Sequence, residues 1–336
     1  MDWFSYLIPL ILLLSWMSVS LYQKHAIKNE IISNINHRTL HKTPTPRGGG
    51  VVFSLLIVFC IFILQSLGSM SNLMLYVFGF GGLAATLFGF VDDVKDLTAG
   101  VKLIVQLFLS GWVVYWLYSS ELLLLDSVPF YVTISFAFFF MVWMINAYNF
   151  IDGIDGMAAS TSVFVSSTLA IVLFATEGPI EVVVIFALIS TAVCGFMFFN
   201  WPPATIFMGD AGSLFLGYMF GSLLLFTVLN DNISIWTWLT VFGYFFADTT
   251  LTQIMRVILV KQWYLAHRSH AYQNLARITG SHSKVTISVV IYNLLWVLPL
   301  TLWSTFQPEM GIVAAFLSII PALVVAFIYG PKLSSS

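Results

Sequence analysis

The segment from residue 145 to 160 crowds four polar side chains into an otherwise apolar sequence: Asn146, Asn149, Asp152 and Asp155. They are three residues apart, so on a helix they would lie along one slowly rotating face and present amides and carboxylates together. The glycines directly after both aspartates would let the backbone turn sharply or approach a ligand. The alternative is a polar loop between two membrane spans, which would be enough to explain a single Asp-Gly pair.

A second group of carboxylates, Asp92, Asp93 and Asp96, lies within about one helical turn. Clustered carboxylates repel one another unless a cation holds them, which favours Mg²⁺. The alternative is structural, because acidic residues at a helix end can cap the next helix or pair with Lys95 and Lys102. From this segment alone, both interpretations stay open.

A further carboxylate, Asp210, lies between two glycines just before an apolar run. It occupies the place of an N-cap, so capping is its structural interpretation. The helix that follows would also offer free N–H groups and a positive dipole end. These suit a phosphate or a metal-bridged phosphate.

The loop at residues 37–50 combines basic side chains with two prolines and three glycines. It could bind an anion through Lys42, Arg47 and exposed backbone N–H groups. Taken alone, however, it is better explained as ordinary positive charge at a membrane face, with a glycine-rich entry to a helix.

A second basic loop contains His267 and His270, which are three residues apart and could share a helix face around Arg268. Arg268 would supply a fork of N–H donors for phosphate oxygens. The alternative is a solvated basic loop. Nearby, Asp248 falls inside an apolar segment, where an ionisable side chain needs an interior partner or a water-filled cavity.

The composition places these residues in a membrane protein. Of the 336 residues, 59% are hydrophobic and 8% are charged, whereas a soluble domain has about 25% charged residues. The mean hydropathy is +0.94. Two cysteines, Cys60 and Cys194, lie in apolar runs and are expected to pack as small hydrophobic residues. The first 22 residues lack a basic start and a small-residue cleavage site, which predicts a retained span rather than a signal peptide.

Eleven windows are long enough to cross about 30 Å of hydrocarbon. They cover roughly residues 3–22, 50–67, 73–91, 103–119, 128–146, 158–176, 182–199, 212–229, 234–255, 286–305 and 311–330. The predicted fold is an all-α polytopic membrane protein that forms a single domain over residues 1–336. The connections after the odd-numbered helices carry the motifs described above, and those after the even-numbered helices are short turns.

Charge predicts the orientation of these helices. All thirteen Lys and Arg residues fall on one side of the eleven-span arrangement, and the opposite loops carry acidic residues without a basic one. By the positive-inside rule, the basic side is cytoplasmic. We therefore expect a periplasmic N-terminus, a cytoplasmic C-terminus and an active site on the cytoplasmic loops.

Together, the loops combine carboxylates for a divalent cation with basic side chains for phosphate, which suits a metal-bridged pyrophosphate at the membrane surface. A cation-coupled transporter is the alternative, but it would need charges near the bilayer midplane. A CDP-alcohol phosphatidyltransferase would need an Asp-Gly-x-x-Ala-Arg motif, which is absent after Asp152. A nucleic-acid partner is not expected, because the basic residues are scattered over separate loops.

These motifs resemble the polyprenyl-phosphate N-acetylhexosamine-1-phosphate transferases, a family that includes the phospho-N-acetylmuramoyl-pentapeptide transferases. The resemblance covers most of the chain. It lies in four segments in this order: Asp92-Asp93 with Lys95 and Asp96, the Asn-x-x-Asn-x-x-Asp-Gly-x-Asp-Gly pattern at 146–156, Phe207-Met-Gly-Asp-x-Gly-Ser213, and His267-x-x-His270. Each segment alone is weak evidence for the family, but the four segments in this order are specific to it.

The resemblance implies transfer of a sugar 1-phosphate from a UDP-N-acetylhexosamine to undecaprenyl phosphate with release of UMP. The implied cofactor is Mg²⁺, with Mn²⁺ as a substitute, and the implied metal ligands are Asp210 and Asp93. Catalytic roles are implied for Asp92, Asp93, His267, Arg268 and His270. Substrate contacts are implied for Lys42, Asn149, Asp152, Asp155, Phe207 and Ser213, with Asp155 and Phe207 at the uracil ring.

The histidine loop departs from the His-His-His run of the muramoyl enzymes. It resembles instead the loop of enzymes that initiate O-antigen or related surface polysaccharides, in the bacterial inner membrane. The expected partners are the UDP-sugar, the polyprenyl phosphate, membrane lipid and, as an option that the sequence leaves open, a second copy of the chain in a homodimer. Direct attack by the lipid phosphate and a covalent intermediate on Asp92 or Asp93 are both open mechanisms.

Overall fold

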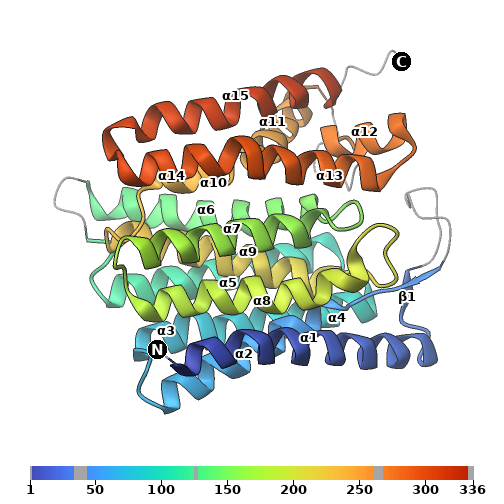
Figure 1. The fold of residues 1–336 in the computed structure, drawn as a ribbon, viewed down its shortest axis with the longest axis horizontal. Coiled ribbons are helices and arrows are strands. Elements are labelled where there is room, and N and C mark those ends of the chain that lie inside the picture. Colours follow the sequence, from blue (N-terminus) through green and yellow to red (C-terminus); the bar gives the residue numbers. More distant parts are fainter. Residues whose placement is uncertain (1, 34–43, 125–127, 260–267, 332–336) are drawn as a thin grey trace.

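The computed structural model describes residues 2–33, 44–124, 128–259 and 268–331, with side chains from Tyr6 onward. The described chain is a stack of helices that run roughly side by side (Figure 1). In chain order the elements are α1 (Asp2–Lys28), β1 (Ile32–Ser33), β2 (Thr45–Pro46), α2 (Gly50–Ser66), α3 (Asn72–Met74), η1 (Leu75–Phe80), α4 (Gly81–Lys95), α5 (Ala99–Ser119), α6 (Phe130–Ile151), α7 (Met157–Ala175), α8 (Ile180–Asn200), α9 (Gly209–Leu229), α10 (Ile235–Val241), α11 (Gly243–Leu259), α12 (Ala271–Thr279), α13 (His282–Tyr292), η2 (Asn293–Val297), α14 (Leu298–Phe306), η3 (Pro308–Met310) and α15 (Gly311–Tyr329).

The predicted all-α polytopic membrane fold is confirmed. Nine helical segments of the described chain are long and apolar enough to cross a membrane. Each of the eleven predicted windows falls on a helix, but two are shorter than expected. Helix α2 has 17 residues, and the window over 234–255 is divided at Phe242 into α10 and α11. The count of eleven spans therefore stays a prediction.

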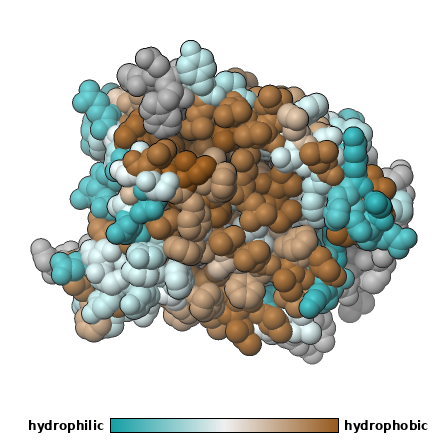
Figure 2. Space-filling view, turned by 90° about the horizontal axis from the view of Figure 1, so that it is seen from below, coloured by the Kyte–Doolittle hydropathy of each residue, from teal (hydrophilic) through white to brown (hydrophobic). Residues whose placement is uncertain are grey.

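The outer surface matches a hydrocarbon solvent. Large apolar side chains point outward along the helices, among them Phe59, Phe139 and Phe327 at 62%, 67% and 68% exposure. Figure 2 shows one face of the molecule with a broad hydrophobic band between two hydrophilic ends. Such a belt would be a liability in water but is favourable in a bilayer.

Two helices form the interior of this bundle. In both α7 and α9, 78% of the most apolar stretch is buried, a larger share than in the other candidate spans of the described chain. Helix α9 packs against α4 and α6. Tyr148 of α6 stacks on Phe220 of α9 at a centroid distance of 5.3 Å, and both rings are fully buried. This packing brings the ends of three motif-bearing helices together.

The motif-bearing connections meet at one end of the bundle, on the right in Figure 1. The short antiparallel pair β1–β2 joins Ile32 to Pro46 in register. Phe207 donates its backbone N–H to the carbonyl of Pro46 at 2.8 Å. Local sequence sets the boundaries here: Asp96 ends α4 in a left-handed conformation, and two prolines after Trp201 prevent α8 from continuing. The loops that carry the predicted site are therefore neighbours in space.

Candidate active site

Asp93 at the end of α4 holds the start of α9. Its Oδ1 accepts the backbone N–H of Asp210 at 2.9 Å, and its Oδ2 accepts that of Ala211 at 3.0 Å. The residue is 3% exposed. Asp93 thus caps α9 from another helix, because it accepts backbone N–H groups that a local N-cap residue would otherwise accept. The alternative interpretation of Asp210 as an N-cap does not hold, because Asp210 lies inside the first turn of α9. The N–H groups of Asp210 and Ala211 are engaged by Asp93 and are not open to a phosphate.

Two glycines permit this contact between α4 and α9. A Cβ on Gly89 would lie 2.3 Å from the carbonyl oxygen of Asp210. Gly209 has a φ of +74°, and a Cβ there would lie 2.5 Å from both carboxylate oxygens of Asp93. Side chains at either position would force the two helix ends apart.

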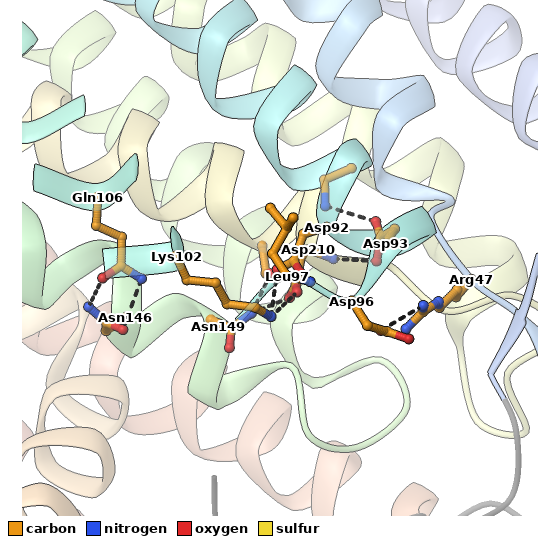
Figure 3. A network of polar contacts seen from close by, with 12 residues as sticks. Arg47, Asp92, Asp93, Asp96, Leu97, Lys102, Gln106, Asn146, Asn149 and Asp210 are labelled. Atoms are coloured by element: carbon orange, nitrogen blue, oxygen red, sulfur yellow. Dashed lines mark hydrogen bonds and ion pairs between the residues drawn. The ribbon is translucent and has the colours of Figure 1, made fainter. Parts of the chain in front are cut away.

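Lys102 of α5 bridges two of the predicted carboxylates (Figure 3). Its Nζ lies 2.5 Å from Oδ2 of Asp92 and 3.0 Å from Oδ2 of Asp210. Asp92 also accepts the backbone N–H of Leu97 at 2.8 Å. The Lys102 side chain is 41% exposed and that of Asp92 only 8%. The cluster is therefore open to the surface on the lysine side. We call Asp92, Lys102 and Asp210 the acidic cluster.

Asn149 connects α6 to the acidic cluster. Its Nδ2 donates to Oδ1 of Asp210 at 2.5 Å and lies 3.1 Å from Oγ of Ser213. Asn146, one turn earlier, exchanges two side-chain hydrogen bonds with Gln106 of α5 at 2.8 and 3.0 Å. The structure therefore brings the predicted Asn149, Ser213 and Asp210 together.

The single polar face predicted for residues 146–155 is only partly correct. Helix α6 ends at Ile151, so Asn146 and Asn149 share the helix while the two aspartates lie in the turn after it. The backbone leaves helical geometry at Asp152, where two Asp-Gly pairs follow in sequence. The turn frees the aspartates to face other segments.

Asp152 stays within electrostatic reach of the acidic cluster. Burial raises the pKa of its carboxyl well above the usual range, and the negative charges of Asp210, Asp93 and Asp155 raise this pKa further. A carboxylate in such surroundings needs a proton or a cation nearby.

Asp155 instead ties three segments to one another. Its Oδ2 accepts the N–H of Ala204 at 3.0 Å, and its Oδ1 lies 3.1 Å from Nδ1 of His282. Its carbonyl accepts the hydroxyl of Thr286 of α13. The carboxylate thus braces the loop against neighbouring segments. Phe207 is likewise held through its backbone, since its carbonyl accepts the N–H of Gly49 at 3.0 Å.

In the described part of the glycine-rich loop, two of the backbone N–H groups that could have bound an anion are already engaged. The N–H groups of Gly49 and Gly50 donate to the carbonyls of Phe207 and Met208. Arg47 forms an ion pair with Asp96 at 2.9 Å. These groups hold the loop in place. Lys42 lies outside the described residues.

The end of the second basic loop is buried against α11. His270 is 1% exposed, and its Nδ1 lies 3.6 Å from Oδ1 of Asp248. Asp248 accepts the backbone N–H groups of Ala271 and Tyr272 at 3.0 and 3.3 Å, so it caps α12. Of the two options for Asp248, an interior partner or a water-filled cavity, the structure shows interior partners. His270 is therefore placed to position α12.

Of the two other predicted residues of this loop, the structure describes only Arg268. Arg268 accepts a hydrogen bond at its carbonyl from Arg277 at 2.7 Å. His267 lies outside the described residues. The catalytic roles of His267, Arg268 and His270 stay predictions.

Two of the carboxylates are suited to a divalent cation. Within the described residues, no group of three or more His, Cys, Asp or Glu side chains is arranged to hold a metal ion. Mg²⁺ needs only one or two carboxylates beside water and substrate phosphates. Asp92 and Asp210 fit that requirement, because both already share one cationic group. Asp93 already accepts backbone N–H groups at both of its oxygens, and its role as a metal ligand stays a prediction.

The chain is similar to proteins of a known family. Residues 74–228, which include α4, α5, α6 and α9, match glycosyl transferase family 4. The chain is 30% identical over 291 residues to the phospho-N-acetylmuramoyl-pentapeptide-transferase of Streptococcus mutans, covering 79% of this chain and 80% of that protein. It is 29% identical over 269 residues to the probable undecaprenyl-phosphate N-acetylglucosaminyl 1-phosphate transferase of Bacillus subtilis, covering 76% and 73%. The chain therefore belongs to glycosyl transferase family 4, the polyprenyl-phosphate N-acetylhexosamine-1-phosphate transferases that its loop motifs resemble.

Proposed function

We propose that this protein transfers an N-acetylhexosamine 1-phosphate from a UDP-sugar to undecaprenyl phosphate, which releases UMP and initiates O-antigen or related surface-polysaccharide synthesis. The observation that carries the proposal is the acidic cluster, in which Lys102 bridges Asp92 and Asp210 at the end of an apolar bundle. This position suits a reaction between a water-soluble pyrophosphate and a lipid phosphate. The names of the two relatives support the reaction class and differ in the sugar.

The polar side chains around the cluster would contact different parts of the UDP-sugar. Lys102 would contact phosphate oxygens, since its ammonium is the exposed cation of the cluster. Asn149, which contacts both Ser213 and Asp210, would fix the carboxylate of Asp210 and line the nucleotide side together with Asp152. The predicted uracil contacts of Asp155 and Phe207, the phosphate contact of Lys42 and the roles of the histidine loop remain part of the proposal.

Asp92 and Asp210 would hold Mg²⁺ or Mn²⁺, which would neutralise charge on the pyrophosphate when bound. Placement of the metal on Asp210 follows the sequence prediction. Asp93 is better explained as the residue that positions Asp210.

The contacts favour direct transfer over a covalent enzyme intermediate. A lipid phosphate oxygen would attack the β-phosphorus of the UDP-sugar, and UMP would leave with the electrons of the broken P–O bond. The lipid phosphate needs little general-base assistance, because a phosphate monoester has a second pKa of about 6 and is already mostly ionised near neutral pH. Both oxygens of Asp93 accept backbone hydrogen bonds, and those of Asp92 are engaged by Leu97 and Lys102. These contacts support the direct route over attack by either carboxylate.

The cation-coupled transporter is the alternative function. Its strongest support in the sequence was Asp248, the carboxylate closest to a midplane position. That carboxylate caps α12 and contacts His270, so its presence has a structural explanation. This observation favours the transferase.

The proposed location is the bacterial inner membrane, with the acidic cluster facing the cytoplasm. The described Lys and Arg residues lie at the cluster end of the bundle or in the helical turns that adjoin it. The positive-inside rule makes this end cytoplasmic, with the N-terminus on the other side. A homodimer is compatible with this arrangement.

The test is UMP release by purified protein in detergent, with undecaprenyl phosphate and a panel of UDP-N-acetylhexosamines, with and without Mg²⁺. Asp210→Asn is expected to lower the rate by about 100-fold or more. The control is Asp231→Asn, which changes a carboxylate on the connection between α9 and α10 and keeps a residue suited to its positive φ. Lack of UMP with every donor, from protein that unfolds cooperatively on heating, would overturn the proposal.

A further inference from the structure

A cavity of about 290 Å³ lies between α11, α12, α13 and α15, in the upper part of Figure 1. It is far larger than the roughly 10–15 Å³ that one water needs. Its wall is mostly apolar and includes Val285, Val289, Ala322 and Val325. The cavity starts beside the first turn of α13 and reaches Tyr292, at the end of that helix. It therefore runs from the loop end of the bundle into the apolar belt.

The loop end of this cavity is positively charged. Lys284 contributes to its lining and is exposed to the surroundings. Between Asp248 and Glu309 the sequence contains Arg and Lys but no Asp or Glu. Within the described residues, no carboxylate lies at ion-pair distance from Lys284. Asp155 is engaged by His282, and Asp248 by α12. The mouth thus suits an anion.

The helices around the cavity face hydrocarbon. Ile287 and Ile291 of α13 are 41% and 51% exposed, and Phe316 and Phe327 of α15 are 61% and 68% exposed. A molecule that enters from this side comes from the bilayer. The chemistry that fits both parts of the cavity is a hydrocarbon chain that ends in an anionic headgroup.

We propose that this cavity binds one acyl chain of an anionic phospholipid, with the headgroup phosphate held by Lys284. The cavity shares no lining helix with the acidic cluster, which belongs to α4, α5 and α9. The two sites are therefore built on different helices. The inference rests on the cavity, its charge and the apolar belt, and does not depend on the proposed transferase reaction.

A lipid in this cavity would also brace the loop that carries Asp152. Tyr272 of α12 donates its hydroxyl to the carbonyl of Phe150. His282 and Thr286 of α13 contact Asp155. Because α12 and α13 form walls of the cavity, a bound acyl chain would stabilise them against this loop. The lipid would act as a structural ligand of the folded protein.

The experiment measures bound lipid and thermal unfolding of delipidated protein in neutral detergent. The added lipid is phosphatidylglycerol, phosphatidylcholine or undecaprenyl phosphate, and native mass spectrometry counts the bound molecules. Phosphatidylglycerol is expected to raise the unfolding temperature more than phosphatidylcholine. Lys284→Gln should weaken phosphatidylglycerol binding about tenfold, as expected for loss of a charged hydrogen bond. The matched control, Lys28→Gln, removes an exposed lysine at the same end of the bundle and should bind normally.

Two further variants test the acyl-chain site. Ala322→Phe should fill the cavity and abolish the stabilisation, and Ser288→Trp should block it from the exposed side if the first variant does not fold. Phosphatidylglycerol binding that is unchanged in Lys284→Gln and in a folded cavity variant would overturn the proposal. Competitive displacement by undecaprenyl phosphate would also overturn it, because the cavity would then belong to the lipid substrate.

Discussion

The ammonium of Lys102 lies 3.0 Å from the carboxylate of Asp210, although 108 residues separate them in the sequence. The same ammonium lies 2.5 Å from Asp92. One cation therefore neutralises two carboxylates on two other helices. These are the two carboxylates that we propose as the metal site.

We expect Lys102→Met to lower the rate of UMP release by about 100-fold, because transition-state charge loses a positioned cation. The KM for the UDP-sugar should rise as well, since under the proposed function the lysine would also contact phosphate in the ground state. Lys102→Arg should recover part of the rate. Steady-state kinetics of the three proteins checks this, and a Lys102→Met enzyme with normal kcat and KM would show that the ion pairs are only structural.

Asp93→Asn should destabilise the protein by about 1–2 kcal/mol, the usual effect of losing a helix cap. An asparagine can accept only one of the two backbone hydrogen bonds that start α9. Chemical unfolding in detergent checks the stability. The rate should fall but stay measurable if Asp93 positions Asp210. Complete loss of activity, together with a trapped phosphosugar on the wild-type Asp93, would instead establish the covalent mechanism.

Gly89→Ala should separate α4 from α9, because its Cβ would lie 2.3 Å from the carbonyl of Asp210. We expect a loss of about 1–3 kcal/mol in stability and a lower kcat. Gly100→Ala is the matched control, since a Cβ there meets no atom within 4 Å. That helical glycine should tolerate alanine or gain about 0.5–1 kcal/mol. Equal effects of the two substitutions would contradict the close packing.

Asp152 should make the stability of the protein depend on pH. Its pKa is raised in the folded state, whereas an unfolded aspartate titrates near about 3.9. Below that value the carboxyl is protonated in both states and has no effect. As the pH rises above it, the unfolded state releases its proton first, so stability falls until the folded carboxyl has also ionised.

Asp152→Asn should therefore unfold at a higher temperature than the wild type at neutral pH and at the same temperature near pH 3. Under the proposed function it should also release UMP more slowly, because the asparagine cannot ionise at the nucleotide side that we propose for Asp152. Thermal unfolding from pH 3 to 8 checks the first expectation. A constant difference between the two proteins across this range would show that the carboxyl does not titrate as its surroundings indicate.

The sequence alone determined the class of protein and the neighbourhood of the site. Apolar runs of membrane-spanning length need no tertiary information, because hydrocarbon requires a helix to satisfy its own backbone hydrogen bonds. Alternation of the helices then brings the connections after the odd-numbered helices to one end. Asn149, Ser213 and Asp210 are close together as that reasoning predicts.

The assignment of individual partners depended on the tertiary structure. The sequence could not show that Asp93 caps α9, since that contact exists only where Gly89 lets two distant helices touch. Nor could it show that Lys102 reaches Asp210, or that His270 is buried beside Asp248. A carboxylate can cap a helix, pair with a lysine or hold a metal with the same local sequence. Which of these it does depends on the donors and charges that packing brings within about 3 Å.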